Sequence, residues 1–146
     1  MRNLTIQRNK TFVACAMKMK VYIEDHTFSE LTICGVPCRK LGEIKNGEAQ
    51  TYSIADNAAK VFVIADMLSK EYCNEVYQLP EGNEDVSLSG KNHFNPMAGN
   101  PFRFDNNNNT EALENRKKGK HMGTIIMICA IAIGFIIGLA IGFGAL

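Results

Sequence analysis

The sequence lacks the residue patterns by which most classes of enzyme are identified. It contains no phosphate-binding loop, no dinucleotide-binding glycine motif and no nucleophile in a setting such as G-x-S-x-G. The adjacent carboxylates Glu24-Asp25 and Glu84-Asp85 lack the D-x-D-x-D spacing of a calcium loop. Asp25 and His26 could form a carboxylate and base pair, but neighbours on a strand point to opposite faces, which favours a surface turn. We therefore expect a non-enzymatic protein without catalytic residues or cofactors.

The sequence also lacks closely paired cysteines. Its five cysteines are irregularly spaced, at Cys15, Cys34, Cys38, Cys73 and Cys129. This spacing does not indicate a disulfide framework. Cys34 and Cys38, with His26 or His93, offer an alternative interpretation as a zinc site, although structural zinc usually takes tighter pairs such as C-x-x-C. We expect reduced thiols and no metal.

Acidic residues are missing from the first twenty positions, which hold five basic residues. Residues 21–115 hold seven basic residues against fifteen acidic ones, a net charge of −8. Nucleic acid is bound by concentrated basic surface, so an acidic domain argues against a nucleic-acid partner. We predict that residues 1–10 form a solvated basic tail, with contact to anionic lipid headgroups as the alternative.

Charged residues are absent from the last 24 positions, residues 123–146. A helix of this length extends about 36 Å, which exceeds the roughly 30 Å hydrocarbon thickness of a bilayer. We predict a transmembrane helix over residues 122–146, in contact with membrane lipid. The basic residues directly before it are Arg116, Lys117, Lys118 and Lys120. Basic residues beside a span tend to stay in the cytoplasm, so we expect a single-pass protein with a cytoplasmic N-terminal domain and its C-terminus outside.

Export of the domain is the alternative topology. Residues 12–15 loosely match the small-residue-then-cysteine site of a bacterial lipoprotein. The apolar segment there is six residues long, however, and a secretory leader needs about 7 to 15. We therefore favour the cytoplasmic topology.

Small residues recur every four positions within the predicted span, at Ala130, Gly134, Gly138 and Gly142. They lie on one helix face, where small residues favour close helix pairing, so we predict a helix–helix interface and a homodimer. A second class of function follows from the same stripe, namely a small oligomeric membrane-active protein such as a pore or transporter accessory. The lack of polar residues beyond Thr124 counts against ion passage.

The soluble part has the residue pattern of β-structure. Residues 13–23 alternate with period two, residues 60–65 (KVFVIA) are almost wholly apolar, and Asn46-Gly47 predicts a tight hairpin between residues 39–45 and 48–54. Shorter strands are predicted at residues 32–36, 76–79 and 85–88, and single helical turns at residues 56–60 and 67–72. This pattern predicts a mainly β fold, a small antiparallel β-sandwich of six to seven strands over residues 11–104.

Residues 105–110 contain no apolar side chain. We predict a flexible polar linker with a basic neck over residues 105–121, which would let the domain move above the membrane. The alternative for its second half is a short helix over residues 110–118 that continues into the span.

The segment before this linker, residues 92–104 (NHFNPMAGNPFRF), combines two Asn-Pro pairs with three phenylalanines. One interpretation is an exposed protein-recognition patch formed by Phe94, Phe102, Arg103 and Phe104. The preferred one is that the phenylalanines fold back to close the bottom of the sandwich.

Three stretches, KVYIEDHTF at residues 20–28, IKNGEAQTYSI at 44–54 and YQLPEGNEDVSL at 77–88, carry a family resemblance. Their order of strand, hairpin and P-x-G turn resembles the small PEGA-type or carboxypeptidase-regulatory-like β-sandwich modules of bacterial membrane proteins. The resemblance implies a binding or spacer module without catalytic residues. The sequence thus leads us to expect a C-terminally membrane-anchored binding or scaffold module for an unknown protein partner.

Overall fold

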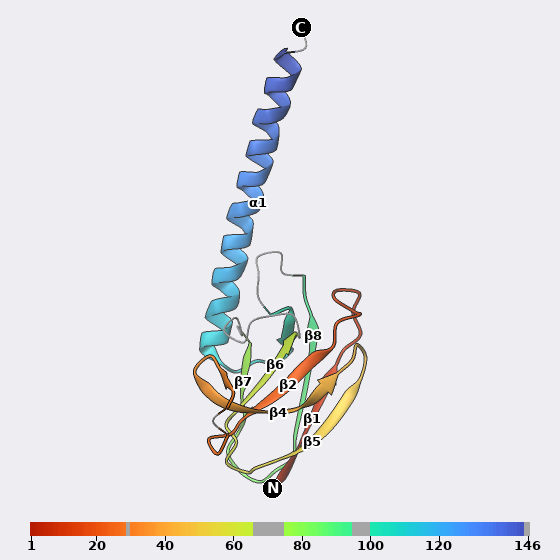
Figure 1. The fold of residues 1–146 in the computed structure, drawn as a ribbon, viewed down its shortest axis with the longest axis vertical. Helices are drawn as coiled ribbons and strands as arrows, with labels where there is room; N and C mark the ends of the chain where they lie inside the picture. Colours follow the sequence, from red (N-terminus) through yellow and green to blue (C-terminus); the bar gives the residue numbers. More distant parts are fainter. Residues whose placement is uncertain (29, 66–74, 95–99, 145–146) are drawn as a thin grey trace.

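Two β-sheets pack against each other, and one long helix runs alongside them and extends beyond them (Figure 1). The computed structural model describes residues 1–28, 30–65, 75–94 and 100–144, apart from the side chains of residues 115, 119 and 138–144 within the helix. The predicted fold class, mainly β with a C-terminal helix, is confirmed, but the described residues form nine strands rather than the six to seven predicted.

The first sheet has four strands in the order β5-β1-β8-β9. Their bounds are β1 Arg2–Arg8, β5 Ala49–Ile54, β8 Val86–Asn92 and β9 Phe102–Phe104. β1 pairs antiparallel with β5 but parallel with β8, in a register that places Leu4 beside Val86 and Arg8 beside Gly90. This parallel pair is a departure from the wholly antiparallel arrangement predicted from the sequence.

The second sheet has five strands in the order β3-β4-β2-β6-β7, all antiparallel to their neighbours. Their bounds are β2 Met19–Glu24, β3 Thr32–Ile33, β4 Val36–Ile44, β6 Lys60–Ala65 and β7 Val76–Gln78. The apolar KVFVIA run, predicted as a central strand, is β6. It lies between β2 and β7, so its position confirms the prediction.

The main core lies between the sheets and takes alternate residues from each strand. Leu4 and Ile6 of β1 face Met19, Val21 and Ile23 of β2 across it, and all are at most 2% exposed. A second, smaller cluster forms around the other face of the five-stranded sheet, from Tyr22, Ile33, Cys38, Phe62 and Ile64. β6 contributes to both clusters, which is why its sequence is apolar on both faces.

The N-terminal segment is not the solvated tail predicted from its charge. Residues 2–8 form β1, the second strand of the four-stranded sheet, and the inward-facing set begins and ends with arginine. Arg2 is 2% exposed and donates hydrogen bonds to the carbonyls of Pro80 (2.7 Å) and Ala58 (3.1 Å). Because the arginines interrupt the apolar alternation, the pattern shows only two apolar residues and was not recognised as a strand.

Two strand predictions also need correction. The strand predicted over residues 13–23 begins only at Met19, because residues 11–17 form a loop. The Asn46-Gly47 turn was predicted to close a hairpin, and Gly47 has a φ of 80°. The strands on either side of it nevertheless belong to different sheets, with β4 paired to β2 and β5 paired to β1. The turn therefore connects the two layers of the sandwich.

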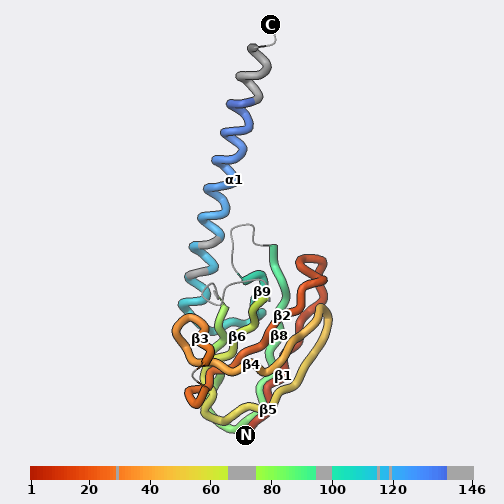
Figure 2. The backbone as a smooth tube through the Cα atoms, viewed as in Figure 1, coloured from red at the N-terminus to blue at the C-terminus, as the bar shows by residue number. Residues whose placement is uncertain are grey.

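The predicted flexible linker is largely helical. Helix α1 spans Thr110–Gly144, so the alternative of a helix that continues into the span is the correct one. Asn109 is its N-cap, with Oδ1 accepting a hydrogen bond from the backbone N–H of Ala112 at 3.0 Å, an interaction typically worth about 1 kcal/mol. Figure 2 shows α1 rising beside the sheets over its first turns and then extending beyond them. Residues 55–58 form a turn and Lys60 begins β6, so the helical turn predicted over residues 56–60 does not form; residues 67–72 lie outside the described residues.

Candidate functional site

The junction between α1 and the sandwich is organised by one buried carboxylate. Glu75 directly precedes β7 and is 2% exposed. Its Oε1 accepts hydrogen bonds from the backbone N–H of Phe104 (3.0 Å) and from Nδ2 of Asn107 (2.7 Å). Arg116 of α1 completes the site, since its Nε donates to Oε2 at 2.9 Å and its terminal nitrogen contacts Oε1. We call Glu75, Asn107, Arg116 and the backbone of Phe104 the Glu75 clasp.

The asparagines that suggested a linker hold the chain against the edge of the five-stranded sheet. Asn107 Nδ2 also donates to the carbonyl of Val76 (3.0 Å), and Asn108 Nδ2 donates to that of Gln78 (3.0 Å). Both acceptors belong to β7, an edge strand whose carbonyls would otherwise be open to pairing with another chain. The residues between β9 and α1 are therefore attached to the sandwich.

These contacts also fix the direction in which α1 runs. Asn108, just before the helix, contacts Gln78, whereas Arg116 contacts Glu75. β7 pairs with β6, and β6 pairs with β2, so a position along β7 can be matched to a position along β2. The direction from Gln78 to Glu75 corresponds to the direction from Ile23 to Met19 in β2. We call the end of the sandwich that contains Met19 the helix-exit end, and the end that contains Glu24 and Gln78 the distal end.

Beyond its contacts with the sandwich, α1 exposes an almost continuous apolar surface. Its large apolar side chains are 43–70% exposed, at Met122, Ile125, Ile126, Met127, Ile128, Ile131, Ile133, Phe135, Ile136 and Ile137. Soluble monomers rarely expose contiguous apolar surface on this scale. The helix is long and apolar enough to cross a membrane, which fits a single-pass membrane protein.

The basic residues before the span have different environments. Lys117, Lys118 and Lys120 are exposed, whereas the Arg116 side chain is 20% exposed and is engaged by Glu75 and by the Phe104 carbonyl at 3.1 Å. Three of the four predicted membrane-proximal side chains are therefore open to headgroups. The fourth attaches the helix to the sandwich, a role that the sequence did not indicate.

The predicted helix–helix stripe is described only in part. A Cβ at Gly134 would meet no atom within 4 Å, and Ala130 is exposed, so both positions are open to a neighbouring helix. Gly138 and Gly142 belong to α1, but their surroundings lie outside the described residues. Dimer formation remains a prediction.

The aromatic patch predicted over residues 92–104 does not form as one surface. Phe102 and Phe104 are 0% and 1% exposed, with ring centroids 5.2 Å apart, and Arg103 between them is half-buried. The core interpretation therefore holds for these two phenylalanines. Phe94 is different, because its side chain is 78% exposed.

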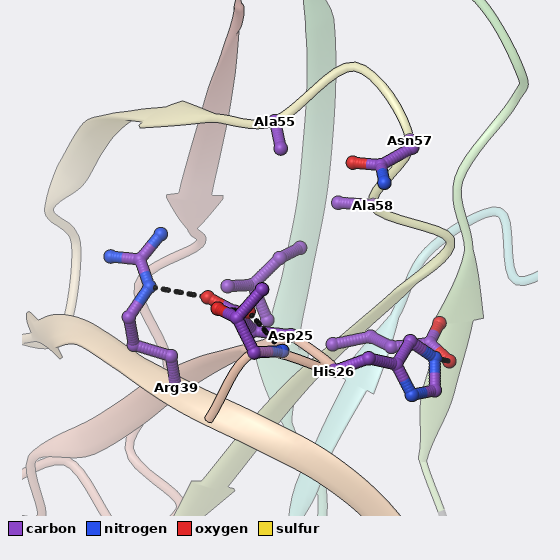
Figure 3. Close-up of a pocket in the computed structure, with 9 residues that line it drawn as sticks. Asp25, His26, Arg39, Ala55, Asn57 and Ala58 are labelled. Atoms are coloured by element: carbon purple, nitrogen blue, oxygen red, sulfur yellow. Dashed lines mark hydrogen bonds and ion pairs between the residues drawn. The ribbon is translucent and has the colours of Figure 1, made fainter. Parts of the chain in front are cut away.

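A pocket of about 240 Å³ opens at the distal end (Figure 3). Asp25, His26 and Arg39 line one side, and Ala55, Asn57 and Ala58 face them from the β5–β6 loop. The suggested Asp25-His26 pair does not form there. Asp25 accepts hydrogen bonds from Thr27 and from Arg39 Nε (3.0 Å), while His26 Nε2 lies 3.0 Å from Glu24 Oε1.

The pocket chemistry is that of a surface turn with an embedded ion pair. The hydrogen bond from the Thr27 hydroxyl, aided by the Thr27 backbone N–H and by Arg39, holds the pKa of Asp25 below its usual range. The second oxygen of Glu24, Oε2, is buried and has no hydrogen-bond partner. A carboxylate with an unused acceptor favours a ligand that carries a hydrogen-bond donor or a positive charge.

The cysteines do not gather into a site within the described residues. Cys15 and Cys34 are exposed, whereas Cys38 is buried, which raises its pKa to about 12. No group of three or more metal-ligating side chains forms in the part of the chain that the structure describes, so the Cys34 and Cys38 zinc alternative has no further ligands there. Cys73 lies outside that part.

The sequence did not indicate the roles of Glu75 and Asn107, or that Arg116 pairs with Glu75. A lone glutamate before a short strand carries no motif, and its partners lie 32 and 41 residues further along the chain. The comparisons with known proteins give no further guide, since no family model and no curated protein matches this chain.

Proposed function

We propose that this chain is a membrane-anchored β-sandwich that holds a protein-binding surface at a fixed orientation to the bilayer. The observation that carries the proposal is the Glu75 clasp. The helix that is apolar enough to cross a membrane begins beside the sandwich and is attached to it by an ion pair with a buried carboxylate. A flexible tether would need no such attachment, so the clasp supports a function that depends on orientation.

The partner surface that we propose is the distal end. It is the end that α1 leads away from, so in a membrane it would face the aqueous compartment. Its pocket is lined by Glu24, whose carboxylate has an unused acceptor, and by Asp25, which is paired with Arg39. We therefore infer a protein partner that presents a basic side chain, with no catalytic step.

The orientation that we propose places the sandwich in the cytoplasm, with the C-terminus outside. Lys117, Lys118 and Lys120 support it, since basic residues next to a span are retained on the cytoplasmic side. Membranes from cells that express the full chain test this topology directly. Cys34 is exposed, so an impermeant thiol reagent should label it in inside-out vesicles and spare it in right-side-out vesicles.

A Cys34→Ser variant identifies which labelling is due to this thiol. Labelling of Cys34 in right-side-out vesicles would reverse the proposed orientation. Recovery of the chain in the soluble fraction after alkaline extraction would refute the anchor itself.

Partner binding is tested by placing a photo-crosslinking residue at Asn57, which faces the pocket, and as a matched control at exposed Thr51 of β5. We expect a discrete crosslinked protein from position 57 alone, and its loss when Glu24 is changed to Gln. The same products from both positions would rule out the distal pocket as the partner surface.

A further inference from the structure

Two phenylalanines are left exposed on neighbouring loops of the sandwich. Phe12 is 98% exposed and Phe94 is 78% exposed. Phe12 lies in the loop that follows β1, and Phe94 comes two residues after β8. Because β1 and β8 are parallel neighbours, these two loops emerge at the same end of the sheet. Moving a phenylalanine side chain out of water is favourable, so exposing two in one region has a cost unless something covers them.

The loop that carries Phe12 is held in place by the sandwich. Arg8 is fully buried and donates to the carbonyls of Met17 (2.6 Å) and Ala14 (3.0 Å). Asn46 binds the loop from the other side, accepting from Thr11 N at 3.0 Å and donating to Thr11 O at 2.9 Å. The exposure of Phe12 is therefore a property of a fixed loop conformation.

This is also the end toward which α1 runs. Loop 9–18 leads directly into Met19, which marks the helix-exit end, and Figure 1 shows this loop at the end of the sandwich from which the helix extends. From Thr110 to Gly123 the helix rises about 20 Å, and a strand of seven residues such as β1 has about the same length. The apolar segment of α1 therefore begins near the level of the loops.

The charge of the helix-exit end matches an anionic surface. Its exposed lysines are Lys10, Lys18, Lys45, Lys91, Lys117, Lys118 and Lys120. His93, next to Phe94, and Arg103, which pairs with Lys91, are half-buried. In the described part of the chain the acidic residues nearest to these loops are fewer, namely Glu43, Glu48 and Asp105. Glu43 pairs with Lys18 and Lys40, Glu48 accepts from the backbone N–H of Lys45, and Asp105 accepts from Asn9 and Ser89.

The distal end has the opposite charge. Its exposed or half-buried acidic residues include Glu24, Asp25, Glu30, Asp56, Glu81, Glu84 and Asp85, of which Asp25 is paired with Arg39 and Asp56 with the N-terminal amine. Charge is therefore separated along the axis of the helix. Basic side chains near an anionic membrane surface contribute about fivefold each to binding, and aromatic rings partition into the headgroup layer.

We propose that the helix-exit end of the sandwich docks onto a bilayer surface rich in anionic phospholipid, with Phe12 and Phe94 inserted at headgroup level. This inference rests on the proposed membrane anchor and adds a second contact to it. The rings take the interfacial apolar layer, and the surrounding lysines contact lipid phosphates. The sandwich then lies against the membrane while its distal pocket faces away.

The chain contains no tryptophan, so a single introduced tryptophan reports its own surroundings. We would reconstitute the full chain into vesicles that contain anionic phospholipid with brominated acyl chains, which quench tryptophan near the bilayer. Three variants, Phe12→Trp, Phe94→Trp and Met127→Trp, report the two loops and the apolar span. Phe28→Trp is the matched control, because Phe28 lies in a distal turn and is 38% exposed.

We expect blue-shifted, quenched emission from positions 12, 94 and 127, and unquenched emission from position 28. Quenching at position 127 with water-like emission at positions 12 and 94 would overturn the docking and leave the anchor intact. Unquenched emission at position 127 would overturn the anchor as well. A blue shift at position 12 without quenching would indicate a protein contact and would also overturn docking on lipid.

The charge contribution is tested separately in the Phe12→Trp background. Changing Lys10 and Lys91 to Gln removes two exposed charges, and we expect the ratio of docked to undocked protein to fall about 25-fold. Lys60→Gln, away from this end, is the control and should leave the ratio unchanged. Equal docking of all three proteins, or equal docking on neutral lipid, would contradict the electrostatic part of the proposal.

Discussion

Replacing Arg116 with Met should destabilise the sandwich even though the residue lies on the helix. Arg116 is the cationic partner of Glu75, a carboxylate that is only 2% exposed. Removing one member of a buried ion pair leaves an uncompensated charge and costs about 3–5 kcal/mol. Two other donors to Glu75 remain, the Phe104 N–H and Asn107, and the Arg116 side chain is itself 20% exposed. We therefore expect the lower end of that range, about 3 kcal/mol.

The measurement is urea unfolding of the full chain in a mild detergent, followed by the circular dichroism of the strands. With a denaturant slope of about 2 kcal/mol per molar, a loss of 3 kcal/mol lowers the midpoint by about 1.5 M. Lys117→Met is the matched control, because it removes the same charge from the next, exposed position of α1. Its effect should stay within about 0.5 kcal/mol, as for most surface substitutions.

A second variant separates the ion pair from general damage to the helix. The double change Glu75→Gln with Arg116→Met removes the buried charge together with its partner. Replacing both partners costs less than leaving one of them unsatisfied, so the double variant should be more stable than Arg116→Met alone. If Arg116→Met and Lys117→Met unfold at the same urea concentration, the clasp does not hold the helix, and the fixed orientation that we propose has no basis.

Three further predictions follow from other parts of the structure. Gly90→Ala should lower the free energy of unfolding in urea by about 1–3 kcal/mol, because its Cβ would lie 2.5 Å from both the Arg103 carbonyl and the Phe102 ring. Lys91→Ala, at the next position, should leave the urea midpoint unchanged. Equal urea midpoints for the two variants would refute the close β8–β9 packing. Asp25, Glu48 and Asp85 have pKa values below their usual range, chiefly through hydrogen bonds from the Thr27 hydroxyl and from the backbone N–H groups of Lys45 and Asn3. The stability that they contribute is thus complete above their unfolded pKa of about 4 and is lost as pH falls through their native pKa values. Asp85→Ala should therefore make the urea midpoint depend less on pH in the acid range. An unchanged dependence of the midpoint on pH would contradict this prediction. Finally, if Ala130 and Gly134 lie in a homodimer interface, Gly134→Ile should abolish cysteine crosslinking through Cys129 in membranes. Ile133→Val is the control and should preserve the crosslink. Crosslinking that survives Gly134→Ile would refute the role of these small residues in a dimer interface.

The sequence was sufficient to predict the elements whose residue pattern is set by local burial. The sequence predicts both the apolar run of β6 and the uncharged segment of α1, because the side chains of each segment are apolar along its whole length. The failures occurred where a residue has an unusual partner. β1 was missed because two of its four inward-facing residues are arginines, whose burial depends on carbonyls of Pro80, Ala58, Met17 and Ala14 supplied by distant segments.

Pairing between strands could not be derived from local pattern either. The Asn46-Gly47 turn has the chemistry of a hairpin, and its glycine adopts the expected positive φ. β4 and β5 lie in different sheets because β4 pairs with β2 and β5 pairs with β1. The sequence pattern placed the start of β2 too early and did not indicate β1 at all. The asparagines at 107 and 108 show the same limit, since a polar run predicts a linker unless the carbonyls of β7 that it binds are known.

The clasp and the proposed docking surface depend on each other physically. A contact made by two aromatic rings and several lysines is weak by itself, but a tether raises the effective concentration of the membrane surface to the millimolar range or above. That gain is realised only when the tether holds the contact in a geometry that reaches the surface. Because the Glu75 clasp directs α1 toward the end that carries Phe12 and Phe94, the same span that anchors the chain brings those rings to the bilayer. Releasing the clasp should therefore weaken docking while leaving the span inserted, so that Arg116→Met reduces quenching at position 12 but not at position 127.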